Sequence, residues 1–166
     1  MPPVFPALMD TVPEIREMLA DEWIPLIYRE KIRPQRTRSF AMDVPERENA
    51  AEILHTLLGI ELKVGKKRFS CPDLATARYL CVFARIGCQN VAIPYDITGI
   101  SVLADELEVG WHKVLLIHEE STAKKSPQSK GKDRSALIRE IRAEINELGA
   151  GDAMPEFKNS TSQRNS

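Results

Sequence analysis

The sequence is poor in the residues that mark several large protein classes. Its 166 residues include only three cysteines, Cys71, Cys81 and Cys88, and no two of them have a CxxC spacing. An odd number of cysteines beside apolar segments argues against a disulfide framework, and a structural zinc site needs closely paired ligands. We therefore predict three reduced core thiols in a cytoplasmic protein.

Long hydrophobic runs and a strong excess of charge are also missing. No apolar stretch approaches the roughly 20 residues that a membrane helix needs. The N-terminal Met-Pro-Pro-Val-Phe-Pro has neither the basic start nor the apolar core of a signal peptide. The formal net charge of -1 argues against a globally basic nucleic-acid binder but leaves room for a local basic patch. The length predicts one domain, and the 43% of hydrophobic residues is ordinary for a soluble protein.

Motifs that identify common enzymes are absent from the sequence. There is no Walker A loop, no GxGxxG and no GxSxG. The histidines, His55, His112 and His118, form no HExxH, HxH or Cys/His pattern. We expect no catalytic residue, no metal site and no cofactor, and hence a protein that acts by binding.

The clearest pattern is a β-hairpin over residues 60–71. Apolar and charged residues alternate over 60–64, a Gly-Lys pair suits a two-residue turn, and a second short strand follows over 67–71. In this register Leu62 lies opposite Phe69, so that the apolar residues of both strands share one face. A shift by one residue would turn charge toward the core.

A buried helix and a short strand follow this hairpin. Pro72 is placed to open the helix, residues 74–86 are apolar almost all round, and Gly87 is placed to end it. Residues 91–93 form an apolar strand, and Pro94 predicts an edge strand or the end of a strand because it has no N–H to donate.

Earlier in the chain, apolar spacing predicts a helix over residues 12–22 and a strand over 39–44. Asp43 has the spacing of a capping box with Glu46, so we expect a further helix that begins there and stops at Gly59. The segment between the first helix and the strand, rich in arginine, reads as a loop or arm.

The later part of the chain contains two more helical patterns. Residues 100–114 have helical spacing, Ser101 is a candidate N-cap, and Gly110 predicts a split or a bend in this segment. Residues 121–134 have the composition of a flexible basic linker, and residues 136–148 form an amphipathic helix. The expected units are residues 1–38 (helix and basic arm), 39–120 (core), 121–134 (linker), 135–150 (C-terminal helix) and 151–166 (disordered tail).

The order of these elements predicts an α+β protein. Strand, helix, strand, strand, helix and strand would give a small mixed four-strand sheet in the ferredoxin-like split βαβ arrangement, with additional flanking helices. An open α/β sheet with another strand order is the alternative.

Clustered cations provide the first functional hypothesis, contact with RNA or DNA phosphates. They lie at the hairpin tip, in the arginine-rich arm and on one face of the central helix. The alternative is that charge on an edge hairpin only prevents aggregation between sheets. The candidate contacts are Arg33, Arg36, Arg38, Lys63, Lys66, Lys67, Arg68, Arg78 and Arg85.

A protein partner is the second hypothesis. The C-terminal helix presents Ile138, Ile141 and Ile145 on one face, which would dock on a partner or back on its own domain. An exposed sheet edge is the other candidate surface of such an assembly or regulatory factor.

A metal-dependent nuclease is the third and weakest hypothesis. Asp43, Glu61 and Lys63 outline the two carboxylates and lysine of such a site. Each residue also has a structural role that would explain its presence: Asp43 as a helix cap, and Glu61 and Lys63 on the solvent-exposed face of a hairpin. Asp96 follows a buried strand, where it either caps the next turn or lines a small polar pocket.

Overall fold

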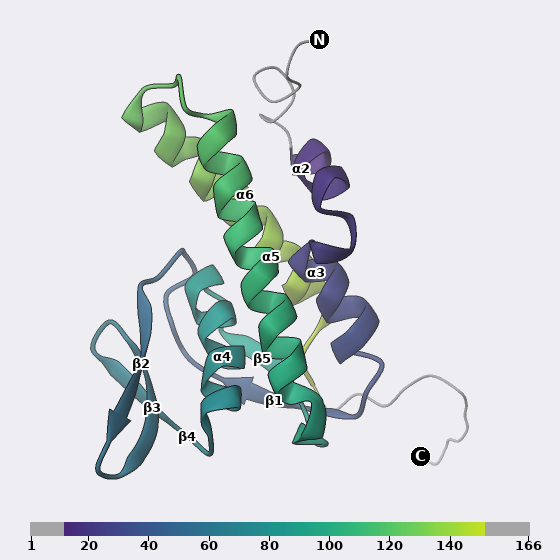
Figure 1. The fold of residues 1–166 in the computed structure, drawn as a ribbon, viewed down its shortest axis with the longest axis vertical. Helices are drawn as coiled ribbons and strands as arrows, with labels where there is room; N and C mark the ends of the chain where they lie inside the picture. Colours follow the sequence, from purple (N-terminus) through teal and green to yellow (C-terminus); the bar gives the residue numbers. More distant parts are fainter. Residues whose placement is uncertain (1–11, 152–166) are drawn as a thin grey trace.

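The protein combines two small antiparallel sheets with a set of packed helices (Figure 1). The structure is a computed structural model, and it describes residues 12–151. The helical elements are α2 (Val12–Leu19), η1 (Ala20–Glu22), α3 (Ile24–Ile27), η2 (Tyr28–Ile32), α4 (Leu74–Ile86), η3 (Ile97–Gly99), α5 (Ile100–Ser121) and α6 (Pro127–Leu148). The strands are β1 (Thr37–Ala41), β2 (Ala51–Thr56), β3 (Gly59–Val64), β4 (Lys67–Cys71) and β5 (Asn90–Pro94).

The three-stranded sheet has the order β2-β3-β4 and contains the predicted hairpin. Leu62 pairs with Phe69 as the alternation of residue types required, which confirms the register. Gly65 occupies the turn with a φ of 61°, a conformation that glycine adopts without strain. Leu62 is fully buried against the core while Glu61 and Arg68 lie on the opposite face.

The helix predicted between Asp43 and Gly59 is wrong. Residues Ala51–Thr56 form β2, which pairs antiparallel with β3 in a register that places Ile53 beside Leu62. The apolar residues of this segment fit both a helical and an alternating pattern. The neighbouring strand β3 offers a complete set of backbone partners, and this long-range pairing decides the conformation. Asp43 consequently caps no helix and lies in a loop with a φ of 54°.

The second sheet contains only β1 and β5, paired antiparallel. Both expected strands are therefore confirmed, although β1 begins at Thr37 and ends at Ala41, earlier than the predicted 39–44. The single four-strand sheet with ferredoxin-like order is not confirmed, because the five strands divide into sheets of two and three strands. All three strand pairings in the described residues are antiparallel, so the open α/β alternative is not confirmed either.

The central helix α4 has the predicted bounds, Leu74–Ile86. Asp73 is its N-cap and accepts a hydrogen bond from the Thr76 N–H at 2.7 Å, so Pro72 precedes the cap and does not open the helix. Gly87 ends the helix with a φ of 94°. A Cβ atom there would lie 2.3 Å from the Arg47 carbonyl oxygen, so only glycine fits.

Helix α5 is continuous over Ile100–Ser121 and is not bent at Gly110. A Cβ atom on Gly110 would lie 2.5 Å from the Glu22 carbonyl oxygen. The glycine is therefore required by the close approach of η1, and not by a bend in α5. The N-cap is Gly99 and not Ser101.

The expected flexible linker over 121–134 is also wrong. Ser121 ends α5, and α6 begins at Pro127 with Ser126 as its N-cap. The side chain of Ser126 accepts a hydrogen bond from the Ser129 N–H at 3.2 Å. The polar composition of this segment belongs to an exposed helix start, where capping stabilises residues that have little apolar surface to bury.

The N-terminal region is also more ordered than expected. The predicted first helix is confirmed as α2 followed by η1, and Pro25 lies in the first turn of α3. The segment expected to be an arm starts with a π-helical turn, Tyr28–Ile32. The predictions for residues 1–11 and 152–166 lie outside the described residues.

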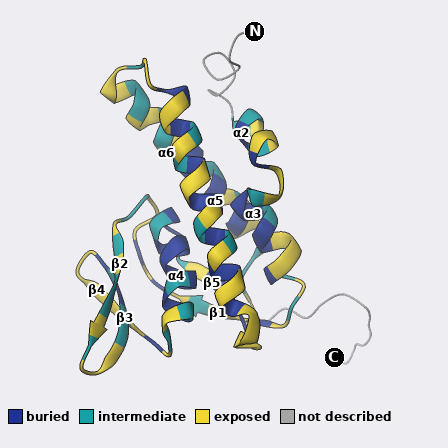
Figure 2. Cartoon of the chain, in the orientation of Figure 1, coloured by how far each residue is buried: buried dark blue, intermediate teal, exposed yellow. Residues whose placement is uncertain are grey.

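One hydrophobic core joins residues from Ile15 to Ile145. Figure 2 shows the buried residues gathered where α3, α4 and α5 meet, with the outer surfaces of the helices and strands exposed. The predicted core thiols are confirmed, since Cys71, Cys81 and Cys88 are buried and free. Burial raises the pKa of the Cys88 thiol to about 12. Between residues 12 and 151, no helix combines the length and apolarity needed to cross a membrane.

Candidate functional site

Arg33 is used inside the fold. Its Nε donates to the Leu148 carbonyl oxygen at 2.9 Å, and its Nη1 donates to Thr37 Oγ1 at 2.8 Å and to the Gly151 carbonyl oxygen at 3.3 Å. These bonds join the end of α6 to the start of β1. Arg33 is therefore a structural tie in the described structure, with most of its donors occupied.

Arg78 and Arg85 also have partners within the chain. Arg78 donates to both carboxylate oxygens of Glu108, at 3.0 and 2.7 Å, and to Asp105. These hydrogen bonds raise the pKa of Arg78 above its ordinary value. Arg85 donates to the Ala51 carbonyl oxygen at 3.1 Å. The two arginines connect α4 to α5 and to β2, and do not form a free basic face.

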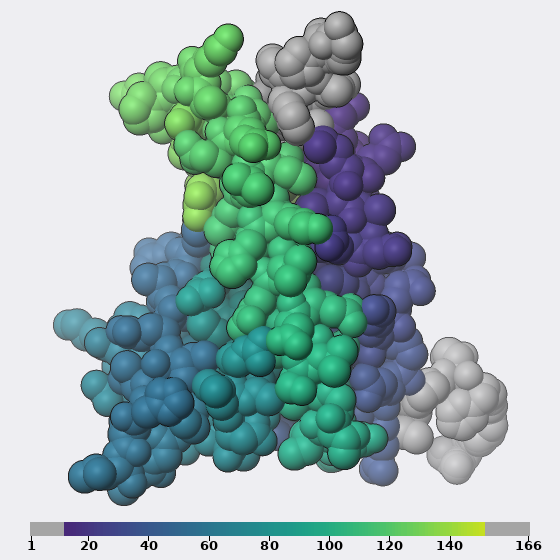
Figure 3. All heavy atoms as spheres, in the orientation of Figure 1, coloured from purple at the N-terminus to yellow at the C-terminus, as the bar shows by residue number. Residues whose placement is uncertain are grey.

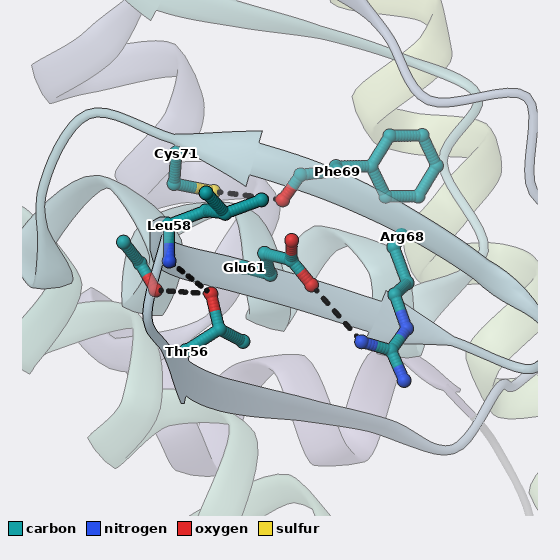
Figure 4. A network of polar contacts seen from close by, with 7 residues as sticks. Thr56, Leu58, Glu61, Arg68, Phe69 and Cys71 are labelled. Atoms are coloured by element: carbon teal, nitrogen blue, oxygen red, sulfur yellow. Dashed lines mark hydrogen bonds and ion pairs between the residues drawn. The ribbon is translucent and has the colours of Figure 1, made fainter.

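The basic hairpin tip is partly neutralised by carboxylates. Lys67 Nζ donates to Asp43 Oδ2 at 2.6 Å and to the Asp43 carbonyl oxygen at 3.0 Å. This hydrogen bond lowers the pKa of the Asp43 carboxyl group. Arg68 pairs with Glu61 at 3.2 Å across the outer face of the sheet (Figure 4).

Six of the nine predicted cations have no carboxylate partner among residues 12–151, and two of these, Arg33 and Arg85, donate to carbonyl or hydroxyl groups instead. Arg36 stacks with its guanidinium 4.9 Å from the centre of the Tyr95 ring. Arg38, Lys63 and Lys66 make no ion pair with any residue in the described range 12–151. Five of the nine predicted cations therefore have hydrogen-bond or ion-pair partners within the described chain.

The outline of a nuclease site is not assembled. Asp43 contacts Lys67, and Lys67 lies opposite Val64 on the inner face of the sheet. Glu61 and Lys63 lie on the outer face. Each carboxylate already has a cation of its own. Among residues 12–151, no group of three or more His, Cys, Asp or Glu side chains is arranged to hold a metal ion.

Asp96 has the capping role considered from the sequence. Its carboxylate accepts hydrogen bonds from the Thr98 N–H at 3.1 Å and from Thr98 Oγ1 at 2.8 Å. These bonds lower the pKa of Asp96. They also fix the start of η3, which leads into α5.

The apolar face of α6 is occupied by the chain itself. Ile138, Ile141 and Ile145 are at most 1% exposed. The helix packs against α3 and α4, and Tyr28 Oη donates to the Gly149 carbonyl oxygen at 2.6 Å. Of the two options open from the sequence, the helix has docked on its own domain, and these isoleucines present no free surface.

The cavity of about 460 Å³ between α3 and α6 has internally satisfied polar groups. Trp23 Nε1 donates to Glu144 Oε1 at 2.9 Å, and the Arg16 guanidinium lies 5.3 Å from the centre of the Trp23 ring while contacting Glu144. The pKa of Glu144 lies below its ordinary value. Burial acts to raise this pKa, but the hydrogen bonds with Trp23, Glu140 and Arg16 lower it by more. Trp23, Arg16 and Glu144 are thus bound to one another and do not point freely into the cavity.

The most exposed apolar side chains lie at a position that the sequence analysis missed. Leu57 and Leu58 form the two-residue turn between β2 and β3, and their relative exposures are 106% and 92%. Asparagine, aspartate and glycine are the usual residues of such turns. The sequence Thr-Leu-Leu-Gly between two segments of alternating residue types is the available signal for this turn. The prediction of a helix over the same residues left it unrecognised.

This turn is held in shape by Thr56. The Leu58 N–H donates to Thr56 Oγ1 at 3.1 Å, and Thr56 Oγ1 donates to the Gly59 carbonyl oxygen at 3.1 Å (Figure 4). Gly59 adopts a φ of 127°. The leucines are therefore presented on a fixed turn at one corner of the molecule, away from α5 and α6 (Figure 1).

The outer edge of β2 adds backbone groups to this corner. In the described residues β2 pairs only with β3, and no strand lies on its other side, where the Ala51 carbonyl oxygen accepts from Arg85. Along β2, Glu52 and His55 are exposed, and Ile53 and Leu54 between them are half-buried. An unpaired strand edge is a template for a further strand.

No protein-family model matches the chain, and neither a curated protein nor a solved structure was found that matches it.

Proposed function

We propose that this chain is a non-catalytic protein-binding module whose contact surface is the hairpin of β2 and β3. The observation that carries the proposal is the pair of fully exposed leucines, Leu57 and Leu58, on a hydrogen-bonded turn. The partner is a protein with an apolar groove that accepts the turn and an extended segment that lies along β2.

The physical reason is the large gain available from burying these two side chains. Moving a leucine from water into an apolar site is worth roughly 1.5–3 kcal/mol. The Thr56 hydrogen bonds fix the turn in advance, so less conformational entropy is lost when a partner binds. The leucines contribute little to the fold because they lie outside the core.

The free edge of β2 supports the same surface. A partner strand beside β2 would form backbone hydrogen bonds, and the exposed side chains of β2, Glu52 and His55, would provide specificity. This is the sheet-edge form of the protein-partner hypothesis. The form that used the C-terminal helix is set aside, because α6 is already packed in the core.

The experiment is site-specific photo-crosslinking with a benzophenone amino acid at Leu57, compared with the same group at Met18. Met18 is 48% exposed and lies on α2. We expect a crosslinked partner protein from position 57 only, and its loss when Leu58→Ser is added. Crosslinks of equal yield at both positions, or none at Leu57, would refute the hairpin surface.

Folding is checked in the same samples. Because Leu57 and Leu58 are exposed, Leu57→Ser and Leu58→Ser should change the free energy of unfolding by no more than about 0.5 kcal/mol. A lost crosslink in a fully folded variant is then a lost contact.

Contact with RNA or DNA is the second candidate, and the observation in its favour is the set of cations without ion pairs, Arg38, Lys63 and Lys66. Three phosphate contacts would give a slope of log K against log salt of about −3. Fluorescence anisotropy with labelled oligonucleotides, repeated with Lys66→Glu, tests this. A partner protein retained at salt concentrations that abolish oligonucleotide binding favours the first proposal.

A further inference from the structure

A narrow apolar stripe runs along the exposed side of α5. Val102, Val109 and Leu116 are 57%, 44% and 58% exposed. They are seven residues apart, and at about 100° per residue this spacing places them in one line along the helix. Leu107 and Trp111 point to the opposite, buried side. Figures 1 and 3 show α5 running along the front of the molecule with no other element over it.

Charged residues flank the stripe in an ordered way. Asp105 and His112 lie on one side of it, and Glu106 and Lys113 lie on the other, as the angular position of each residue on the helix requires. On both flanks the acidic residue is nearer the start of α5, and the basic or titratable residue is nearer its end. Val109 lies at the centre of this arrangement.

We infer that α5 pairs antiparallel with α5 of a second copy of this chain, about a two-fold axis at Val109. In this arrangement Val109 meets Val109 of the other copy, and Val102 meets Leu116. An isologous contact of this kind needs a surface that is complementary to itself. The apolar stripe satisfies that requirement because Val109 lies midway between the other two residues.

The flanking charges select the antiparallel direction. Glu106 of each copy faces Lys113 of the other, and Asp105 faces His112, so each pairing occurs twice. A parallel arrangement would place Asp105 of each copy opposite Glu106 of the other, which is repulsive. Complementary charge at an interface favours the matched orientation and disfavours the wrong one.

The intramolecular ion pairs of these residues are compatible with the contact. Glu106 accepts from Lys31 at 2.6 Å, and Lys113 pairs with Glu22 at 2.7 Å. The exposed fractions of these four side chains lie between 33% and 52%. The second copy therefore extends two existing pairs into one alternating network across the interface.

A hollow beside Val109 adds space for side chains of the second copy. It has a volume of about 290 Å³, and its walls include Ile27, Lys31 and Glu106. The antiparallel pairing brings Lys113 of the other copy to this flank, where its aliphatic stem covers apolar wall atoms and its ammonium group reaches Glu106.

The expected association is weak and depends on concentration. One pair of helices buries less than the roughly 1,200–2,000 Å² of a standard stable interface. We expect a dissociation constant of roughly 10–1,000 μM. The contact is independent of the hairpin formed by β2 and β3, so this inference and the proposed function stand or fall separately.

The first experiment is sedimentation velocity of the full chain up to about 1 mM, which covers the weak end of the expected affinity range. Val109→Glu places two like charges on the two-fold axis and is expected to remove the dimer, whereas Met18→Glu on exposed α2 is expected to keep it. A monomer throughout the range, or a dimer unaffected by Val109→Glu, overturns the inference.

A charge exchange then tests the direction of the two helices. Glu106→Lys alone, or Lys113→Glu alone, brings like charges together and should weaken the dimer by about threefold or more, a typical size for an exposed pair. The double variant restores opposite charges and should recover the affinity. Failure of the double variant to recover, with circular dichroism showing a folded protein, contradicts the antiparallel pairing.

Cysteine crosslinking provides an independent readout of the same geometry. Val109→Cys should form a disulfide with its counterpart in the second copy under mild oxidation, because both lie at the two-fold axis. Val102→Cys should not crosslink to itself but should do so when mixed with Leu116→Cys. A higher crosslinking yield for Val102→Cys with itself than with Leu116→Cys would indicate a parallel dimer and overturn the inference.

Discussion

Arg33 and Leu148 are 115 residues apart in the sequence and are joined by a hydrogen bond of 2.9 Å from Arg33 Nε to the Leu148 carbonyl oxygen. The bond gives a partner to a carbonyl group at the end of α6, because the last carbonyl groups of a helix have no N–H partner within the helix. It ties the C-terminal helix to the segment that precedes β1. A residue first assigned to phosphate contact is thus part of the structural framework.

Arg33→Met is expected to lower the free energy of unfolding by about 1.5–3 kcal/mol, because it removes charged hydrogen bonds to Leu148 and Thr37. Arg38→Met, at an exposed position of β1, is the matched control and should change it by less than about 0.5 kcal/mol. Urea denaturation of both variants is the measurement. Equal effects of the two changes would show that the tie contributes nothing to stability.

Gly110→Ala should destabilise the protein even though alanine favours a helix. The added Cβ would lie 2.5 Å from the Glu22 carbonyl oxygen, so η1 has to shift, at a cost of about 1–3 kcal/mol. Gly131→Ala in α6 has open space around it and should stabilise by about 0.5–1 kcal/mol. Thermal unfolding monitored by circular dichroism compares the two, and a stabilising Gly110→Ala would contradict the close contact.

His118 should make the stability depend on pH. The side chain is 4% exposed, and burial, together with the charge of Arg134, lowers the pKa of His118 below 6.5. The unfolded chain then binds a proton before the folded chain does. Stability should therefore fall as the pH decreases through 6.5, and the loss should be complete below the folded pKa.

His118→Leu, which has a similar volume and does not titrate, should remove this part of the pH dependence. Urea midpoints at about pH 7.5 and 5.5 bracket the unfolded histidine pKa and test it. The carboxylates Asp43 and Asp96, whose pKa values are lowered, act in a more acidic range. The same decrease in both proteins would mean that other groups titrate in this window.

Ile141→Ala should cost about 2–5 kcal/mol, since Ile141 is fully buried in α6 and its truncation leaves a cavity. Ala143→Ser, two residues further on the exposed side of the same helix, should have an effect below about 0.5 kcal/mol. Chemical denaturation measures both. A small effect of Ile141→Ala would show that α6 is not firmly docked on its own domain.

The sequence by itself determined the elements whose pattern allows one conformation. The hairpin of β3 and β4 follows from strict alternation, since any other register turns charge inward. Helix α4 follows from an apolar run that ends at Gly87, and the buried side of α6 follows from the spacing of its isoleucines. In each case the information lies within a few residues of where it acts.

Only the tertiary structure decided the remaining features. The residues of β2 fit a helix or a strand equally well until β3 is available to pair with them. From the sequence, Gly110 predicts a helix bend, and only the structure shows that η1 lies against it. The polar composition of residues 121–134 predicts a linker, although α6 begins within this segment. These choices depend on partners distant in the sequence, which local periodicity does not record.

The same reason explains the candidate sites. Clusters of arginine and lysine are visible in the sequence, but their charge partners are not, and Arg78 meets Glu108 only when α4 packs on α5. Leu57 and Leu58 are apolar residues that a sequence pattern assigns to a buried face, and only the turn between β2 and β3 exposes them. The sequence determined which side chains are present, and the packing of distant segments determined which of them remain free to bind.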